Sequence, residues 1–366
     1  MKRLVLLGGG HAHVHVLRSL AVRPIADVQV HLVTPFSRQV YSGMLPGWIA
    51  GHYLLDECVI PLPPLVHAAQ ARSHAASALR IDADRRAVHC TDGSVLPYDV
   101  LSIDVGSAPH DAGIEGADTS ALPIRPLENF IAHVSALKAA PPPRLALLGA
   151  GAAGVELALA LRHGLRTTDV ALISAANTLP GHTASRVLRA LKRANVTLIA
   201  GQPAVHVDAA GIHLADGHLV GADVIVTALG PRAPRWLKES GLACDDDGYL
   251  MVDDCLRSVS HADIFAAGDC ASRPDAPRPK SGVYAVRAGP PLAENLRRAL
   301  SGVPLKSYFP QRHALYLLAT GPRHAIGTWG PFAWEGAWTW HWKDRIDRAF
   351  IRRYTYPVQP VAIGMA

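Results

Sequence analysis

One segment, near residue 150, restricts the fold more than any other part of the chain. The apolar run Leu145 to Leu148 predicts a buried parallel strand, and Gly149-Ala-Gly151-Ala-Ala-Gly154 follows it and opens a helix. In such a turn the first glycines let backbone N–H groups approach a diphosphate at the helix N-terminus, and the third lets the helix pack closely on the strand. The segment therefore predicts an α/β fold with a dinucleotide site.

The same order of strand, glycine turn and helix occurs at the start of the chain. Leu4 to Leu7 predicts a buried strand, Gly8-Gly9-Gly10 a tight turn, and 11–20 a helix. His13 stands where the third glycine would be, so this match is incomplete.

Two later segments support a duplicated architecture. Residues 98–109 and 222–234 each end a hydrophobic strand pattern with a glycine, Gly106 or Gly230, and then a proline. They follow the two glycine turns at similar distances, so we expect two related halves.

Residues 262–271 predict a further strand that ends at Gly268 and Asp269. A carboxylate at this place can accept hydrogen bonds from a sugar-alcohol chain. It can also cap the next helix, and both roles can hold together.

Length and cysteine spacing narrow the class of protein. A chain of 366 residues with 49% hydrophobic residues can form two or three folded domains. The five cysteines stand far apart, so neither a disulfide framework nor a zinc cluster is predicted, and a reducing cytoplasm fits best. The apolar start reads as a short buried strand better than as a signal peptide, and no uninterrupted apolar run is long enough for a membrane span.

Three histidines near the N-terminus raise the question of a metal. On a helix from Gly10, His11 and His15 share a face, whereas His13 points away. No acidic residue or cysteine lies nearby in sequence. We expect no metal site, and we expect His11 and His13 to lie beside a bound diphosphate.

The C-terminal segment, 303–366, differs in composition from the rest. It holds eight Lys or Arg against three Asp or Glu, and five of the seven tryptophans. Basic residues with tryptophan are typical of a membrane interface. The shift marks a separate C-terminal module.

A helix in this segment is predicted to be amphipathic but imperfect. Its apolar sector consists of Trp338, Trp342, Ile346, Ala349 and Phe350. Arg348 and Arg352 flank this sector, and Trp340 and Ile351 lie on the other side of the helix. Docking on a membrane surface and packing on the body or on a second copy of the chain remain equal alternatives. Nucleic acid is not expected as a partner, because no recognition motif is present.

Taken together, these segments resemble the pyridine nucleotide-disulfide oxidoreductase superfamily, the flavoproteins with two dinucleotide-binding domains, and within it the type II NADH dehydrogenases. The motifs "YSGMLPGWIAGHY", "RPLENF", "IFAAGDCA", "GVYAVRAGPP" and "WKDRIDRAFIRRY" are similar to those of a subgroup of flavoproteins linked to selenide, water dikinase. The resemblance covers the whole chain.

The resemblance implies two Rossmann-like domains that bind FAD and NAD(P), with the FAD domain interrupted by the NAD domain. The expected ranges are 1–120 and 255–302 for FAD, 121–254 for NADH or NADPH, and 303–366 for the C-terminal module. The residues expected to hold FAD are Gly8, Gly10, His11, Ala12, His13, Thr34, Pro46, Gly106, Gly268, Asp269, Lys280, Gly282 and Val283. Those expected to hold the nicotinamide nucleotide are Gly149, Gly151, Ala152, Gly154, Glu156, Ser174 and Gly230.

Both expected sites lack the acidic residue that commonly binds an adenosine ribose. Thr34 and Ser174 stand at those two positions. At Ser174 no negative charge would repel a 2'-phosphate, so the choice between NADH and NADPH stays open.

The cysteine pair of the disulfide reductases is also missing, since the corresponding region holds a lone Cys58. A lone thiol cannot carry two electrons as an internal disulfide. We therefore expect hydride to pass from nicotinamide to flavin and electrons to pass on to a quinone or another small acceptor. Lys280 and Glu156 are the candidate catalytic residues, Lys280 as a stabiliser of negative charge on the reduced ring.

Two other functions remain open: reduction of a sulfur or selenium compound, and a flavin-binding companion protein with little turnover. The expected location is the cytoplasm, with peripheral attachment to the inner face of the membrane.

Overall fold

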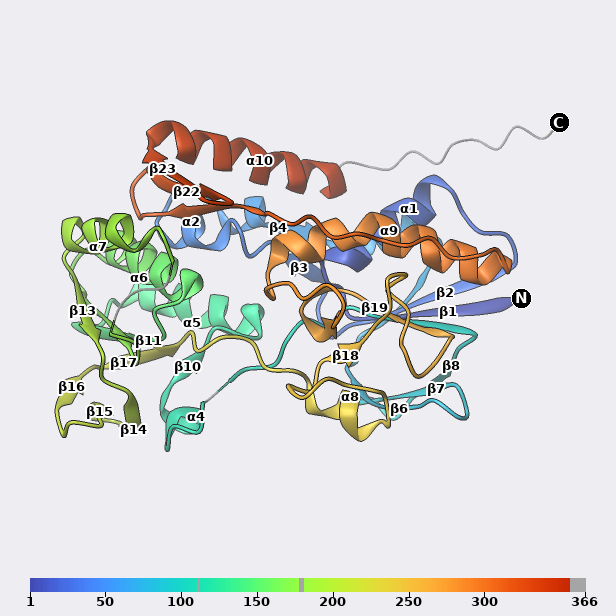
Figure 1. Cartoon of the computed structure of the whole chain (residues 1–366), viewed down its shortest axis with the longest axis horizontal. Coiled ribbons are helices and arrows are strands. Elements are labelled where there is room, and N and C mark those ends of the chain that lie inside the picture. The colour runs from blue at the N-terminus through green and yellow to red at the C-terminus, as the bar shows by residue number, and fades with distance from the viewer. Residues whose placement is uncertain (111, 178–180, 356–366) are drawn as a thin grey trace.

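Two parallel β-sheets of five strands form the framework of the molecule. The computed structural model describes residues 1–110, 112–177 and 181–355, and Figure 1 shows the two sheets side by side. The three inner strands of each sheet are short, mainly apolar runs that are mostly buried, as a parallel sheet covered by helices requires.

The first sheet has the strand order β19-β9-β1-β2-β5, and all its neighbours are parallel. Its strands are β1 (Lys2–Leu7), β2 (Val28–Val33), β5 (Arg72–His74), β9 (Val100–Ile103) and β19 (Ile264–Ala266). The central strand β1 is buried from Leu4 to Leu7 and pairs with β2 and β9. The glycine turn at Gly8 therefore lies at the carboxyl edge of the sheet.

The second sheet repeats this design, with the order β10-β17-β11-β12-β13 and parallel pairing throughout. Its strands are β10 (Leu122–Pro123), β11 (Arg144–Leu148), β12 (Asp169–Ser174), β13 (Val196–Ala200) and β17 (Val224–Thr227). β11 occupies the place of β1, and β17 that of β9. The duplicated architecture expected from the sequence is present.

Helices cover both sheets. The helices are α1 (His11–Val22), α2 (Leu45–Ile49), α3 (Leu62–Ala68), α4 (Ala117–Ser120), α5 (Leu127–Ala139), α6 (Ala152–Gly164), α7 (Ala184–Arg193), α8 (Arg235–Glu239), α9 (Gly282–Ser301) and α10 (Ala337–Thr355), with short 3-10 helices at Leu55–Cys58 and Gly268–Cys270. α1 packs along α9, and Gly289 makes this approach possible because a Cβ there would lie 2.8 Å from the His15 Cβ.

Each half also carries a small antiparallel sheet at the same place in the chain order. The first comprises β6 (Ala78–Asp82), β7 (Ala87–Cys90) and β8 (Val95–Pro97), and the second β14 (Ala204–Asp208), β15 (Gly211–Leu214) and β16 (Leu219–Gly221). Two-stranded pairs join β3 (Arg38–Val40) with β4 (Val59–Pro61), and β18 (Leu250–Met251) with β20 (Ala271–Ser272).

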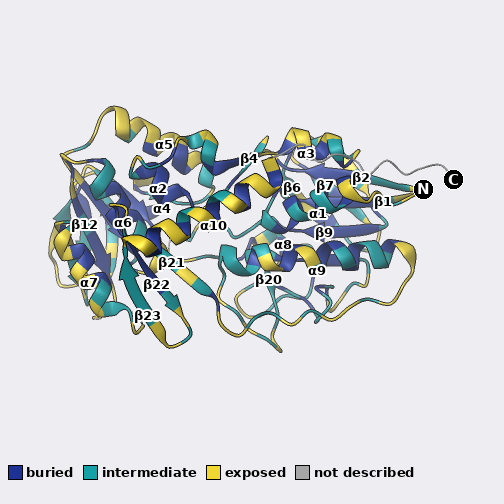
Figure 2. Ribbon diagram, turned by 90° about the horizontal axis from the view of Figure 1, so that it is seen from above, coloured by how far each residue is buried: buried dark blue, intermediate teal, exposed yellow. Residues whose placement is uncertain are grey.

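The C-terminal part forms a three-stranded antiparallel sheet followed by α10. The strands are β21 (Leu315–Ala319), β22 (Ala325–Trp329) and β23 (Phe332–Gly336). In Figure 2, α10 lies across the molecule from the second half toward the first, with buried and exposed residues alternating along it. None of the described helices has an apolar stretch that could cross a membrane.

The predicted apolar face of α10 is only partly the face that packs on the body. Trp340 and Ile351, expected on the other side, are buried, whereas Trp338, Trp342 and Ile346 are exposed. Phe350 is buried by stacking on Tyr41, with ring centroids 4.4 Å apart. The helical pattern predicted an apolar sector, but it could not show that the ion pair of Lys343 and Asp347 lies on the buried face.

Candidate cofactor-binding site

Both glycine turns have the backbone conformation that the sequence requires. Gly8 has φ +89°, and a Cβ there would lie 2.3 Å from the Asp104 carbonyl oxygen at the end of β9. Gly149 has φ +106°, and its Cβ would lie 2.4 Å from the Ala228 carbonyl oxygen after β17. The two turns therefore approach the neighbouring strand in the same way, which only glycine permits.

The second turn also shows why its third glycine is needed. A Cβ on Gly154 would lie 1.8 Å from the Gly149 carbonyl oxygen, so α6 can pack on β11 only with glycine at this position. Gly151 is the N-cap of α6, and no side chain caps this helix end. Its Cβ would meet no atom of the described chain within 4 Å. The N-terminus of α6 is open toward a ligand.

The first turn differs, because a carboxylate of the protein lies at the start of α1. The Asp104 Oδ2 atom accepts hydrogen bonds from the N–H groups of Ala12, at 2.8 Å, and of His13, at 3.0 Å. Burial raises the pKa of Asp104 to about 7, although these two N–H groups favour the ionised form. The turn residues Gly8, Gly9, Gly10 and His11 line the adjoining cavity.

His13 does not have the role that the sequence suggested. Its Nδ1 atom lies 2.7 Å from the Gly8 carbonyl oxygen and its Nε2 atom 2.8 Å from the Ser102 hydroxyl. Both ring nitrogens are thus used inside the protein, and burial lowers the pKa of His13 to about 4. The ring braces the turn from the position where the second turn has Gly154, and no ring N–H is left for a diphosphate.

A single large cavity, of about 1960 Å³, opens between the two turns. Of the expected cofactor-binding residues, those lining it are Gly8, Gly10, His11, Thr34, Pro46, Gly106, Gly149, Gly151, Ala152, Glu156, Ser174, Gly230, Asp269, Lys280, Gly282 and Val283. Those that do not line it are Ala12, His13, Gly154 and Gly268. The structure brings both sets together around one space.

Polar atoms on the cavity wall lack partners in the described chain. They are the His11 Nε2, Ser107 Oγ and Ser281 Oγ atoms, each inaccessible to solvent. Burial lowers the pKa of His11 to about 4, with a further lowering from the charge of Arg125. Unpaired buried polar groups are costly unless a ligand pairs with them. These atoms and the open glycine turns fit a large polar cofactor such as FAD.

Arg125 is a site residue that sequence reasoning missed. Its Nη2 atom lies 3.1 Å from the Asp269 Oδ2 atom, and both residues line the cavity. The residue precedes the "RPLENF" motif's proline, but nothing in the sequence places it opposite Asp269. Arg125 follows β10 of the second half and Asp269 follows β19 of the first, so the ion pair joins the two halves.

Lys280 lies on the cavity wall just before α9. Its Nζ atom donates a hydrogen bond to the Ala271 carbonyl oxygen and lies 3.9 Å from the centre of the Tyr249 ring. Burial lowers the pKa of Lys280, whereas the charges of Asp245 and Asp269 work in the opposite direction. Its place as a candidate catalytic residue remains a prediction.

Glu156 belongs to a buried charged cluster that joins α6 to α10. Its Oε1 atom accepts a hydrogen bond of 2.7 Å from the Ala319 N–H, and burial raises the pKa of Glu156 to about 7. Lys343 and Asp347, one helical turn apart on α10, form an ion pair of 2.7 Å. The Tyr41 hydroxyl donates to Asp347 at 3.1 Å. No local sequence pattern predicts this cluster, since charged residues on an amphipathic helix ordinarily face water.

No cysteine is among the described residues that line the cavity. Cys58 is fully buried beside the carbonyl oxygen of Leu54, and burial raises the pKa of its thiol to about 12. Such a thiol stays protonated and unreactive.

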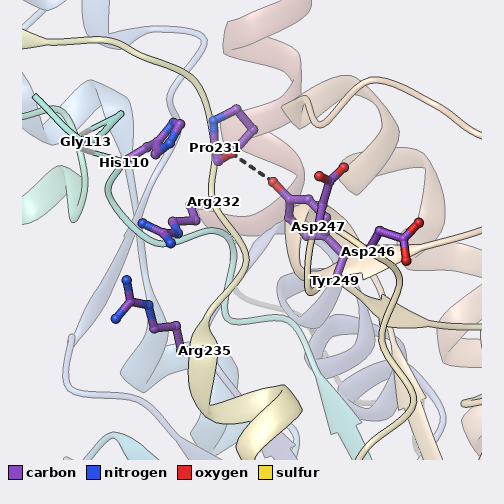
Figure 3. Close-up of a pocket in the computed structure, with 8 residues that line it drawn as sticks. All are labelled: His110, Gly113, Pro231, Arg232, Arg235, Asp246, Asp247 and Tyr249. Atoms are coloured by element: carbon purple, nitrogen blue, oxygen red, sulfur yellow. Dashed lines mark hydrogen bonds between the residues drawn. The ribbon is translucent and has the colours of Figure 1, made fainter.

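A second, smaller cavity of about 710 Å³ adjoins the first at Pro231 and Arg235. Figure 3 shows His110, Arg232 and Arg235 on one side of it and Asp246 and Asp247 on the other. The Tyr249 hydroxyl closes one side by donating to the Pro231 carbonyl oxygen at 2.9 Å. The cavity lies where the chain crosses between the two halves, since Ala108 and Arg232 form a β-bridge.

Two dinucleotide folds that open on one cavity define a protein of the two-dinucleotide-binding class. In agreement, the family described as pyridine nucleotide-disulphide oxidoreductase matches residues 2–289. The chain belongs to this family. The predicted family, α/β fold class, FAD and NAD(P)H as cofactors and the NAD(P)H oxidoreductase class are confirmed.

Individual relatives are distant. The type II NADH:quinone oxidoreductase of Staphylococcus saprophyticus is 23% identical over 342 residues, which cover 84% of this chain and 85% of that protein. Ferroptosis suppressor protein 1 of Xenopus laevis is 27% identical over 217 residues, and the match covers 55% of this chain and only 56% of that protein. The sulfide:quinone oxidoreductase structure from Aquifex aeolicus has a TM-score of 0.80 at 19% identity, covering 97% of this chain and 92% of that chain.

Proposed function

We propose that this protein is an FAD-dependent NAD(P)H dehydrogenase that passes electrons to a quinone or another small diffusible acceptor. The observation that carries the proposal is the single cavity onto which both glycine turns open. The chemistry that bound FAD would supply there is acceptance of hydride from the nicotinamide and release of electrons to the acceptor.

The protein's own contribution is to hold and orient two ligands. The first turn, Arg125, Asp269 and the start of α9 are the groups that would hold FAD. The open N-terminus of α6, with Gly151 and Ser174, would hold the nicotinamide nucleotide. We assign 1–120 with 255–302 to the first role, 121–254 to the second and 303–366 to the C-terminal module.

An apolar wall supports a quinone-like acceptor. The side of the cavity next to α10 is lined by Tyr41, Leu45, Leu318, Ile346 and Phe350. An acceptor with a flat apolar ring would gain from burial against these side chains. The sulfur alternative has no thiol on the described cavity wall to support it, and Cys58→Ser should leave turnover within twofold of the native rate.

The test is anaerobic stopped-flow mixing of the purified flavoprotein with NADH and with NADPH. We expect one or both nucleotides to bleach the flavin absorbance. The absorbance should return when a short-chain quinone is added. A protein that binds flavin but is bleached by neither nucleotide would instead be the companion protein with little turnover.

We further propose that the C-terminal module docks on a membrane surface at the cytoplasmic face. Trp338 and Trp342 are exposed on α10 and stack with Trp334 of β23, with ring centroids 6.2 to 6.4 Å apart. Trp329 and Phe332 extend this exposed aromatic surface. Exposed patches of this kind mark interaction sites, and tryptophan beside arginine suits a lipid interface.

A further inference from the structure

A cluster of metal-ligand side chains lies outside the cofactor site, on the small antiparallel sheet of the second half. β14 and β15 form a hairpin in which His206 pairs directly with His213. Asp208 follows His206 by two residues on β14, so its side chain lies on the same face of the hairpin. All three residues are partly exposed, which gives an ion access to them.

The three side chains already have the spacing of metal ligands. The Asp208 Oδ2 atom lies 3.0 Å from the His213 Nε2 atom and 3.6 Å from the His206 Nε2 atom. The potential ligand atoms of the three residues all lie within 4.8 Å of one another. In a tetrahedral zinc site with bonds of about 2.0–2.1 Å, ligand atoms stand roughly 3.3 Å apart. An ion could bind here with only small side-chain movements.

Neighbouring groups hold two of these ligands in place. The Asp208 Oδ1 atom accepts hydrogen bonds from the N–H groups of Ala210, at 2.8 Å, and Gly211, at 3.2 Å. Its Oδ2 atom is thereby turned toward the histidines.

His206 has an outer partner on its other ring nitrogen. The Glu115 Oε2 atom lies 3.6 Å from the His206 Nδ1 atom, which is buried and without a hydrogen bond in the described structure. Metal-bound histidines commonly donate their second N–H to a carboxylate, so this arrangement directs Nε2 toward the ion.

We propose that His206, Asp208 and His213 bind one divalent transition-metal ion of the zinc type, with water as the fourth ligand. Glu115 orients His206 from the segment that crosses from the first half to the second. Because Glu115 also pairs with His206 through a β-bridge, the ion would tie the hairpin to this crossing segment. This site is independent of the proposed dehydrogenase function.

The test is a calorimetric titration of untagged, chelator-treated protein with Zn²⁺. We expect one equivalent to bind, and the affinity for that equivalent to fall at least tenfold in His206→Ala and in His213→Ala. Binding of Co²⁺ should give the visible absorption bands of a four-coordinate site, and these bands should be absent in both variants. His213→Gln serves as a second variant in which the side-chain volume is kept.

The matched control is His218, which pairs with Asp216 at 3.0 Å beside the same sheet but has no second histidine in reach among the described groups. His218→Ala should bind Zn²⁺ as the native protein does. The proposal would be overturned if the native protein, His213→Ala and His213→Gln bound Zn²⁺ with equal affinity. It would also be overturned if His218→Ala lost as much Zn²⁺ affinity as His213→Ala. Circular dichroism and flavin content establish that each variant is folded.

Discussion

Gly151 and Gly154 stand three residues apart but constrain the protein in different ways. Gly154 is needed for packing, since its Cβ would enter the Gly149 carbonyl, whereas Gly151 faces open space on the cavity side. A sequence fingerprint treats both as one motif. The structure separates a glycine that the fold needs from one that the ligand needs.

Gly154→Ala should therefore destabilise the protein by about 1–3 kcal/mol, because α6 must move away from the turn. Gly151→Ala should leave the urea midpoint unchanged and weaken NADH binding at least tenfold, because its methyl group would occupy the ligand side of the turn. Denaturation curves and fluorescence titration of NADH check the pair. Equal effects of the two variants on stability would contradict this division.

Asp104 makes the stability of the flavin-free protein depend on pH. Its pKa is raised from about 3.9 in an unfolded chain to about 7 by burial. The folded state therefore binds the extra proton, and the stability it adds is complete below pH 4 and lost as the pH rises through 7. In Asp104→Asn this loss is absent.

Between pH 4 and pH 8, the free energy of unfolding of the native protein should therefore fall by about 2–4 kcal/mol relative to that of Asp104→Asn. Urea unfolding at both pH values measures this change. The exposed Asp92, whose pKa is lowered by hydrogen bonds from Ser94, provides the control, and Asp92→Asn should give no such gain. A difference that does not change with pH would show that Asp104 is ionised throughout.

At the scale of elements, α10 is held by a buried ion pair within an apolar face. Lys343 and Asp347 are 8% and 4% exposed, and Glu156 and Tyr41 surround them. Burial works against the charge of Lys343, but Asp347 and Glu156 keep its pKa raised. The helix is thus docked in part by a charged pair on its buried side.

Asp347→Asn should destabilise the protein by about 3 kcal/mol, because it leaves Lys343 buried beside a neutral partner. Glu294 and Arg298 on α9 have the same spacing and a distance of 2.7 Å but are partly exposed, so Glu294→Gln should cost no more than about 0.5 kcal/mol. Chemical denaturation compares the two. A similar small loss in both variants would mean that water reaches Lys343.

On the scale of the whole molecule, charge and exposed aromatic area are concentrated in one module. Residues 303–366 carry five of the six net positive charges. The native protein should therefore sediment with vesicles that contain anionic lipid and much less with neutral vesicles. The double variant Trp338→Ser, Trp342→Ser should lose most of this binding.

Phe309 is an exposed aromatic residue outside this surface, so Phe309→Ser should bind vesicles like the native protein. If the double variant still sediments with anionic vesicles, another surface is responsible. If it instead changes the elution volume of the protein without altering lipid binding, the exposed tryptophans pack against a second copy of the chain.

The sequence by itself determined the two dinucleotide folds, and most of the residues that it marked as cofactor-binding line the shared cavity. It could do so because a strand, a glycine turn and a helix are local features whose spacing is read directly along the chain. Only the tertiary structure decided how Asp104 and His13 use the first turn, where Arg125 meets Asp269, and which face of α10 is buried. These contacts join residues far apart in sequence, and burial changes the charge and pairing preferences of each group in ways that no local pattern contains.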